Sequence, residues 1–185
     1  MFTGIVQALG RIVHDEPLEI LSGNLDLADV AVGDSICVQG VCLTVTALRT
    51  RGFTADVSDE TRRVTAGLHA GAEVNLEKSL TLAGKLGGHL VTGHVDGVGE
   101  VLSFAGGVLR IAVPHALSRY VARKGSICVD GVSLTVNKVD RDAFEVFLIP
   151  HTLEVTTLRR LMPGAPVNLE VDLIARYVER MLGKE

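Results

Sequence analysis

The chain contains one sequence module twice, and no other feature limits its fold as strongly. Residues 35–45 read SICVQGVCLTV and residues 126–136 read SICVDGVSLTV, so the two segments differ at two positions. The same offset of 91 residues matches Phe53 to Phe144 and Thr61 to Thr152, and the motif VNLE recurs at 74–77 and 167–170. A repeated module predicts two similar domains, and therefore two similar sites.

The length supports this division. At 185 residues the chain can form two small domains, each near the lower size limit for a single apolar core. The segment GKLGG at 84–88 has the composition of a linker and directly precedes the second copy. We therefore predict an N-terminal domain over 1–88, a second domain over 89–172 and a terminal segment over 173–185.

Composition and charge exclude several classes of partner. The chain is 47% hydrophobic and 22% charged with a net charge of −4, which argues against disorder and against binding to nucleic acid or to an anionic membrane. No apolar run approaches the roughly 20 residues of a membrane span, and the N-terminus does not resemble a signal peptide. We expect a cytoplasmic protein that binds a small molecule.

The three cysteines predict free thiols. They form no Cys-x-x-Cys pair, and their odd number argues against a disulfide framework. Cys37 and Cys128 occupy equivalent positions in the two copies and are interpreted as small buried hydrophobic residues. His89 and His94 lie an odd number of residues apart, which on a strand places them on opposite faces, so no metal site is expected. His89 is interpreted as structural.

The hydrophobic pattern predicts an all-β fold. Short runs rich in Val, Ile, Leu and Thr alternate with turn-forming clusters. Asp130-Gly131 is a favourable type I′ turn pair and places a hairpin at the centre of the module. We favour a closed Greek-key barrel over a sandwich for each copy, because closure removes exposed strand edges.

Only the end of the chain has a helical pattern. Apolar residues recur at helical spacing at positions 174, 177, 178, 181 and 182, with Asp172 as a candidate N-cap and Gly183 as a candidate end. The apolar stripe could pack on its own barrel. Since the helix has no counterpart in the repeat, we expect instead that it joins subunits.

Alternation along the hairpin strand separates core positions from candidate site positions. Val41, Leu43 and Val45 share one face and are expected to face the barrel interior. The other face carries matched polar pairs, Cys42 with Thr44 in the first copy and Ser133 with Thr135 in the second. A solvated strand face is the alternative, but repetition of polar residues favours a shared ligand.

These residues resemble a known family. The segments MFTGIV (1–6), GVCLTV (40–45), GHLVTGHVDG (88–97), DGVSLTV (130–136) and IPHTL (149–153) are similar to riboflavin synthases of the α-chain type. The resemblance covers the whole chain in order, and so many separated motifs make it specific.

The resemblance implies a fold and a reaction. The fold would be two six-stranded Greek-key barrels with a C-terminal helix, assembled as a homotrimer. The reaction would be the dismutation of two 6,7-dimethyl-8-ribityllumazine molecules into riboflavin and 5-amino-6-(D-ribitylamino)uracil, with no cofactor and no metal. Lumazine synthase is implied as a candidate partner protein. The site would lie between the first barrel of one subunit and the second barrel of its neighbour.

The resemblance also implies catalytic roles. Cys42 would add to the lumazine ring or orient the water that does, and His94 would transfer a proton at the 7-methyl group. Ser133 and Thr135 would hydrogen-bond the second lumazine. The resemblance implies two further site residues. Ser35 would lie beside the site, with a structural hydroxyl as the alternative because its copy Ser126 weakens any unique role. Asp172 would steer the substrate or the reacting water, and it could also serve as a helix cap.

Binding residues carried over from the family form two groups. The first site would take Gly4, Ile5, Val6, Cys42, Leu43, Thr44, Asp56, Val57, Ser58, Asp59, Glu60 and Thr61. The second site would take Gly93, His94, Val95, Lys124, Ser133, Leu134, Thr135, Leu148, Ile149, Pro150, His151, Thr152 and Leu153. This chain departs from the family pattern at Gln39, where Asn commonly occurs, and in the acidic composition of 56–61.

Two other functions compete with the enzyme. One is a lumazine- or flavin-binding protein of the same family without turnover. Retention of Cys42, His94, Ser133 and Thr135 together argues against it, because simple binding does not require a thiol and an imidazole. The other is a structural β protein that assembles through its terminal helix, which leaves the paired polar faces unexplained.

Overall fold

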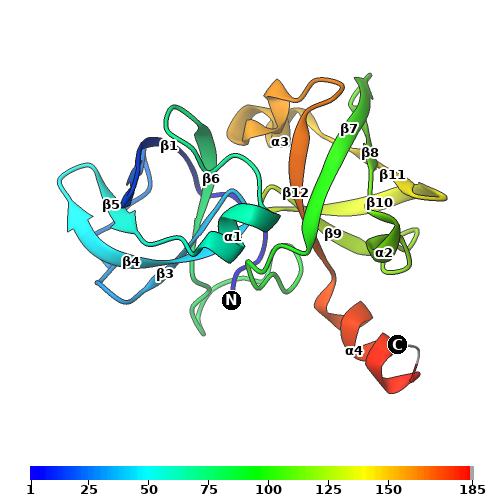
Figure 1. Ribbon diagram of the computed structural model, residues 1–185, viewed down its shortest axis with the longest axis horizontal. Helices are drawn as coiled ribbons and strands as arrows, with labels where there is room; N and C mark the ends of the chain where they lie inside the picture. The colour runs from blue at the N-terminus through cyan, green and yellow to red at the C-terminus, as the bar shows by residue number, and fades with distance from the viewer. Residues whose placement is uncertain (184–185) are drawn as a thin grey trace.

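The computed structural model describes residues 1–183 and consists of two closed antiparallel barrels side by side (Figure 1). Residues 184 and 185, the end of the predicted terminal segment, lie outside the described residues. The first barrel has the strand order β1-β2-β5-β4-β3-β6. Its strands are β1 (Ala8–Asp15), β2 (Leu18–Leu21), β3 (Ser35–Val38), β4 (Val41–Arg49), β5 (Gly52–Ala55) and β6 (Glu73–Lys78).

The second barrel repeats this topology. Its strands are joined in the order β10-β11-β8-β7-β12-β9, which is the first barrel's cycle with equivalent strands. They are β7 (Gly97–Ala105), β8 (Val108–Ala112), β9 (Ser126–Val129), β10 (Val132–Asp140), β11 (Ala143–Phe147) and β12 (Pro166–Val171). The prediction of two six-stranded barrels is confirmed.

Few helices accompany the strands. In equivalent positions, α1 (Asp59–Val64) follows the first barrel's β5 and α3 (Pro150–Val155) follows the second barrel's β11. The second half also contains α2 (His115–Ser118) and a short 3₁₀ helix, η1 (Thr157–Arg160).

Each barrel encloses its own apolar core. The interior positions of the hairpin strand are buried as predicted, with Val41, Leu43 and Val45 at most 4% exposed. Phe53 belongs to the first core and its copy Phe144 to the second, and both are at most 1% exposed. Burial of one such side chain contributes about 1.5–3 kcal/mol to the stability of its barrel.

The central hairpins have the predicted turn geometry in both copies. The backbone φ angles are +51° and +87° at Gln39 and Gly40, and +50° and +80° at Asp130 and Gly131. Positive φ at both central positions defines a type I′ turn, whose twist matches that of the flanking strands. Gln39 is a less usual residue here than Asp130, since Asn and Asp tolerate this conformation best.

The two hairpin turns meet at the contact between the barrels. The Asn75 side chain donates to the Asp130 carbonyl (2.8 Å), and the Asn168 side chain donates to the Gln39 carbonyl (2.9 Å). Phe2 and Val91 form a short antiparallel bridge across the same contact and, with Cys37 and Cys128, a small apolar cluster. Because each bond has a counterpart, the contact has approximate two-fold symmetry.

The terminal helix α4 (Leu173–Met181) projects away from both barrels (Figure 1). Arg176 pairs with Asp96, and Arg119 with Glu179 (2.8 Å), so polar residues attach the helix to the second barrel. The apolar stripe is exposed, with Ile174 at 62% and Tyr177 at 65%. The stripe does not pack on its own barrel.

Candidate functional site

The segment before the first strand of each barrel, here called its leading segment (residues 1–7 and 89–96), crosses to the other barrel. The N–H of Cys42 in the first barrel donates to the carbonyl of Gly93 (2.8 Å). In the equivalent contact, the N–H of Ser133 in the second barrel donates to the carbonyl of Gly4 (2.8 Å). The residues that differ between the copies, Cys42 and Ser133, therefore each lie beside a leading segment.

Only glycine fits at these crossings. A Cβ atom at Gly93 would lie 2.6 Å from Cys42 Cβ, and one at Gly4 would lie 2.6 Å from Ser133 Cβ. Both glycines also have positive φ, +79° and +73°, which other residues adopt at a cost. The glycines bring backbone amides close to the polar strand face.

Buried glutamates fix the leading segments, and the sequence analysis did not identify them as site residues. Glu77 accepts hydrogen bonds from the Thr3 N–H (2.7 Å) and hydroxyl (2.7 Å) and from the Gly4 N–H (2.9 Å). Its copy Glu170 accepts the same bonds from Thr92 and Gly93, and one more from the His94 N–H (3.1 Å). The signal was present, since VNLE recurs and a repeated acidic residue in a strand is unusual.

The crossing corrects the expected grouping of the two sites. Gly4, Ile5 and Val6 were assigned with Cys42, but Gly4 lies against Ser133, and Val6 packs against the core of the second barrel. Likewise Gly93 lies against Cys42, and Val95 packs against the core of the first barrel. Each candidate site therefore combines a hairpin strand from one copy with a leading segment from the other.

The polar faces have the predicted orientation. Cys42 and Ser133 are half-buried, and Thr44 and Thr135 are exposed, on the outer faces of their barrels. Ser35 is the strand partner of Thr44, so it lies on the same outer face. The register thus places the hydroxyl pair Ser35 and Thr44 on the same face as Cys42, two residues along the strand, and the pair Ser126 and Thr135 in the same relation to Ser133.

Three predicted binding residues have side chains in a barrel core. Leu43, Leu134 and Leu148 are 4%, 8% and 1% exposed. Their contribution to an external ligand is therefore limited to backbone groups. The Leu148 N–H is already used, because it donates to the Gly107 carbonyl (2.8 Å).

The other predicted binding segments follow equivalent strands. In the first copy, Asp56–Thr61 leads from β5 into α1, and the Ser58 hydroxyl caps that helix by accepting the Thr61 N–H (3.1 Å). In the second copy, Leu148–Leu153 leads from β11 into α3, with Pro150 at its first turn. Lys124 precedes β9, is exposed and has a φ of +68°.

His89 contacts the second site, although it was interpreted as structural. Its Nδ1 lies 2.7 Å from the Ser133 hydroxyl oxygen, and its Nε2 is buried without a partner among the described residues. Burial lowers the pKa of His89, opposed by the nearby carboxylate of Asp172. A neutral imidazole beside Ser133 can accept or return the hydroxyl proton.

Asp172 serves as the helix cap that the sequence suggested. Its carboxylate accepts the Ile174 N–H (2.9 Å) at the start of α4. Its negative charge also acts on His89, so the cap lies near the Ser133 side of the molecule. The two interpretations of Asp172 are geometrically compatible.

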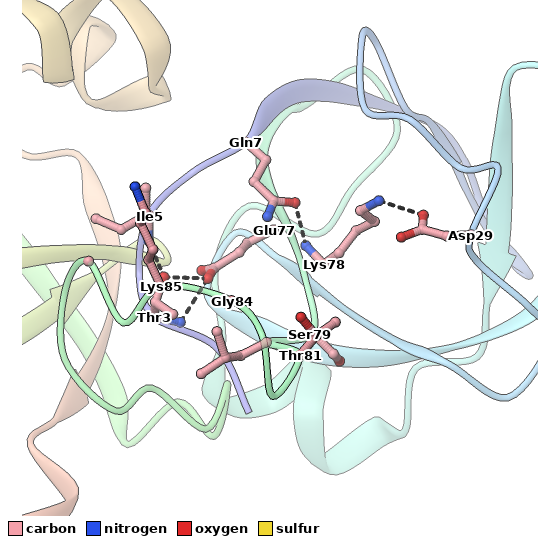
Figure 2. A pocket seen from close by; sticks show the side chains of 12 residues that line it. Thr3, Ile5, Gln7, Asp29, Glu77, Lys78, Ser79, Thr81, Gly84 and Lys85 are labelled. Atoms are coloured by element: carbon pink, nitrogen blue, oxygen red, sulfur yellow. Dashed lines mark hydrogen bonds and ion pairs between the residues drawn. The ribbon is translucent and has the colours of Figure 1, made fainter.

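A cavity of about 390 Å³ lies beside the first leading segment (Figure 2). Thr3 and Glu77 form hydrogen bonds at its edge, and Lys78 pairs with Asp29 (2.5 Å) within it. Of the predicted binding residues, only Ile5 contributes to its lining. The cavity is therefore not the expected site.

The described residues contain neither a group of three or more metal-ligating side chains nor a helix long and apolar enough to cross a membrane. The three thiols lie in or against one small apolar cluster, because Cys42 packs against the cluster that contains Cys37 and Cys128. Cys37 and Cys128 are buried, Cys42 is half-buried, and all three are free, as predicted.

Comparison with known proteins accounts for the repeated sites. Residues 3–79 and 92–172 each match the family model of the lumazine binding domain. The chain is 47% identical to the riboflavin synthase of Mycobacterium tuberculosis (strain ATCC 25618 / H37Rv), over 98% of both chains. It is 46% identical to that of Photobacterium leiognathi, over 98% of this chain and 89% of the relative.

This chain belongs to the riboflavin synthase family. Two solved structures related to this family have the same fold. The structure of LumP complexed with 6,7-dimethyl-8-(1'-D-ribityl) lumazine has a TM-score of 0.80 at 26% identity and covers 92% of this chain and 99% of its own. The structure of LumP complexed with riboflavin has a TM-score of 0.79 at 28% identity, with the same coverage.

The matched ranges fall within the predicted domains 1–88 and 89–172. The boundaries themselves remain predictions, because the leading segments contact both barrels.

Proposed function

We propose that this chain is a riboflavin synthase that converts two molecules of 6,7-dimethyl-8-ribityllumazine into riboflavin and 5-amino-6-(D-ribitylamino)uracil. The observation that carries the proposal is its 39–47% identity to riboflavin synthases over nearly the whole chain. The paired barrels support it, since each presents a polar hairpin strand beside a glycine-anchored leading segment.

The reaction needs two related pockets. One lumazine gives a four-carbon unit and the other receives it, so the atoms of two substrate molecules equal those of the two products. No external oxidant or reductant enters this balance. Two pockets that bind the same molecule in opposed orientations supply the proximity and alignment that the transfer requires.

Differences between the copies would assign the donor and acceptor roles. In the site at the first barrel, Cys42 lies beside Gly93, and His94 follows in the chain. A thiol there could add to the lumazine ring or orient water, and the imidazole could remove a proton from the 7-methyl group. In the site at the second barrel, Ser133 is backed by His89 (2.7 Å), which suits hydrogen bonding and proton return.

We further propose that the protein acts as a homotrimer. The exposed apolar stripe of α4 supports association, because Ile174, Tyr177 and Met181 are 62%, 65% and 86% exposed in the single chain. Assembly would bring the first barrel of one subunit to the second barrel of its neighbour and so bring the two pockets together. Binding of lumazine synthase and a cytoplasmic location remain predictions.

The decisive experiment is incubation of the purified protein with 6,7-dimethyl-8-ribityllumazine, followed by absorbance. We expect one riboflavin for every two lumazines consumed. Tight binding with an unchanged spectrum would identify a chromophore carrier, a function that the likeness to LumP makes the main alternative.

A substitution at the first site refines this test. Cys42→Ser is expected to lower turnover by about 100-fold or more while leaving lumazine affinity nearly unchanged, because a hydroxyl is a much weaker nucleophile than a thiolate. Affinity is measured by fluorescence titration. Equal turnover in the variant would remove Cys42 from the mechanism.

A further inference from the structure

The first barrel carries two thiols directly opposite one another. In the register of β3 with β4, Cys37 is the partner of Cys42. Residues directly opposite in an antiparallel pair project to the same side of the sheet, here the outer face. Consistent with this, Cys42 packs against the apolar cluster that contains Cys37.

The backbone spacing at this pair suits a disulfide. Val38 and Val41 flank the two-residue turn and form the hydrogen-bonded pair, so Cys37 and Cys42 form the next, non-hydrogen-bonded pair. The outward hydrogen bond of the Cys42 N–H to Gly93 agrees with this assignment. Cα atoms in such a pair are about 4.5 Å apart, inside the range of about 4.4–6.8 Å that a disulfide spans.

The two thiols differ in access. Cys42 is half-buried at the candidate site, whereas Cys37 is 2% exposed and its sulfur faces the hairpin turn of the second barrel near Gly131. Burial also raises the pKa of Cys37 well above its ordinary value, with a smaller contribution from the buried Glu77. An oxidant from solution therefore reaches Cys42 first, while Cys37 stays shielded from solvent.

We propose that Cys42 and Cys37 form a reversible oxidation site in which a hydroperoxide oxidises Cys42 and Cys37 then closes a cross-strand disulfide. In the first step the Cys42 thiol loses its proton and the thiolate attacks the peroxide, which breaks the O–O bond and gives a sulfenic acid and hydroxide; the released proton converts this hydroxide to water. In the second step the Cys37 sulfur, losing its proton, displaces hydroxide from Cys42 sulfur and forms the S–S bond. Two thiols and one hydrogen peroxide thus become one disulfide and two waters.

The second barrel lacks this site. Its equivalent strand pair is Cys128 with Ser133, and a hydroxyl cannot form the bond. The repeat therefore supplies an internal control, because Cys128 is as buried as Cys37 (1% and 2% exposed) but has no thiol opposite it.

A consequence for activity rests on the proposed function. If Cys42 acts on lumazine, the disulfide removes its thiol from the site, and peroxide inactivates the enzyme until a dithiol reductant restores it. The disulfide itself does not depend on that function, so the two claims can fail separately.

The test is peroxide treatment of the folded full-length protein, alkylation of the remaining thiols and tryptic digestion. Cleavage after Arg and Lys leaves Cys37 and Cys42 in one peptide, 12–49, and Cys128 in another, 125–138. We expect peptide 12–49 to lose two hydrogens and to resist alkylation, and dithiothreitol to reverse both changes. Cys128→Ala should behave like the wild type.

The variant Cys37→Ala should not form the disulfide, and its Cys42 should proceed to sulfinic acid, which dithiothreitol does not reverse. Cys37→Ser replaces it if the alanine variant does not fold. Either of two results with the wild-type protein would overturn the proposal. One is a peptide 12–49 whose two thiols are both still alkylated after peroxide treatment, and the other is a disulfide link between peptides 12–49 and 125–138. If the reduced protein makes no riboflavin from lumazine but peroxide still forms the disulfide, only the proposed function is overturned.

Discussion

Asp130 is a buried carboxyl at the contact between the barrels, and we predict that it makes stability depend on pH. It is 3% exposed, and its Oδ1 accepts the N–H of Asn168 (2.8 Å). Burial raises the pKa of Asp130 from 3.8 to about 7, against the smaller opposing effects of hydrogen bonds from Asn168 and Gln39. The equivalent position in the first copy holds an uncharged amide, Gln39.

The sign of the effect follows from proton binding. Because the folded protein holds the Asp130 proton more tightly than the unfolded chain, the free energy of unfolding falls as pH rises from about 4 to about 7 and is level above. At 1.36 kcal/mol for each pH unit, ionisation of this group costs the folded state about 4 kcal/mol at pH ~8. The contribution is nearly absent at pH ~4.

The substitution Asp130→Asn removes the ionisation and retains the local geometry. Asn tolerates the φ of +50° at this position, and its side-chain oxygen can still accept the Asn168 N–H. We expect the variant to be more stable than the wild type at high pH, with the difference growing by about 3 kcal/mol between pH ~5 and pH ~8.

The assay is urea unfolding followed by circular dichroism at several pH values and one fixed protein concentration, since assembly also contributes to stability. The matched control is Gln39→Glu, which places a carboxyl at the equivalent position and should lose stability as pH rises. A difference between Asp130→Asn and wild type that does not change with pH would refute the reasoning.

Three further predictions concern the site and the assembly. Gly93→Ala, which brings a Cβ within 2.6 Å of Cys42 Cβ, should weaken lumazine binding at the first site, and fluorescence titration that finds unchanged affinity would contradict the crossing geometry. Glu170→Gln should lower the free energy of unfolding by about 1–3 kcal/mol, because an amide cannot accept all the bonds now made by the carboxylate, and urea unfolding measures the change. Deletion of 174–185 should lower the mass in solution to that of a single chain, measured by light scattering, and an unchanged mass would exclude the helix as the assembly element.

Much of the fold could be predicted because local patterns determine it. Alternation placed Val41, Leu43 and Val45 inside the barrel, and Asp130-Gly131 marked the hairpin turn, since both follow from backbone geometry within a few residues. The same alternation placed Cys42 and Ser133 on the outer face. The apolar periodicity identified α4 for the same reason.

The pairing between copies could not be predicted in this way. Matching Gly4 to Gly93 shows that the leading segments are equivalent, but alignment does not say which barrel each one contacts. The crossing depends on contacts far apart in the sequence, such as Glu77 with Thr3 and Ser133 with Gly4. His89 has no counterpart in the first copy, so the repeat gave no signal for its contact with Ser133.

The crossed leading segments have a consequence for the origin of this architecture. A chain with a single barrel would leave its own leading segment and hairpin strand unpaired, and two identical copies could satisfy both by exchanging segments. Fusion of two such copies makes the exchange intramolecular, at a high effective concentration. Each half then always pairs with the same other half of the chain, so the two sequences can diverge. One copy can acquire a thiol and the other a hydroxyl at equivalent positions, as at Cys42 and Ser133.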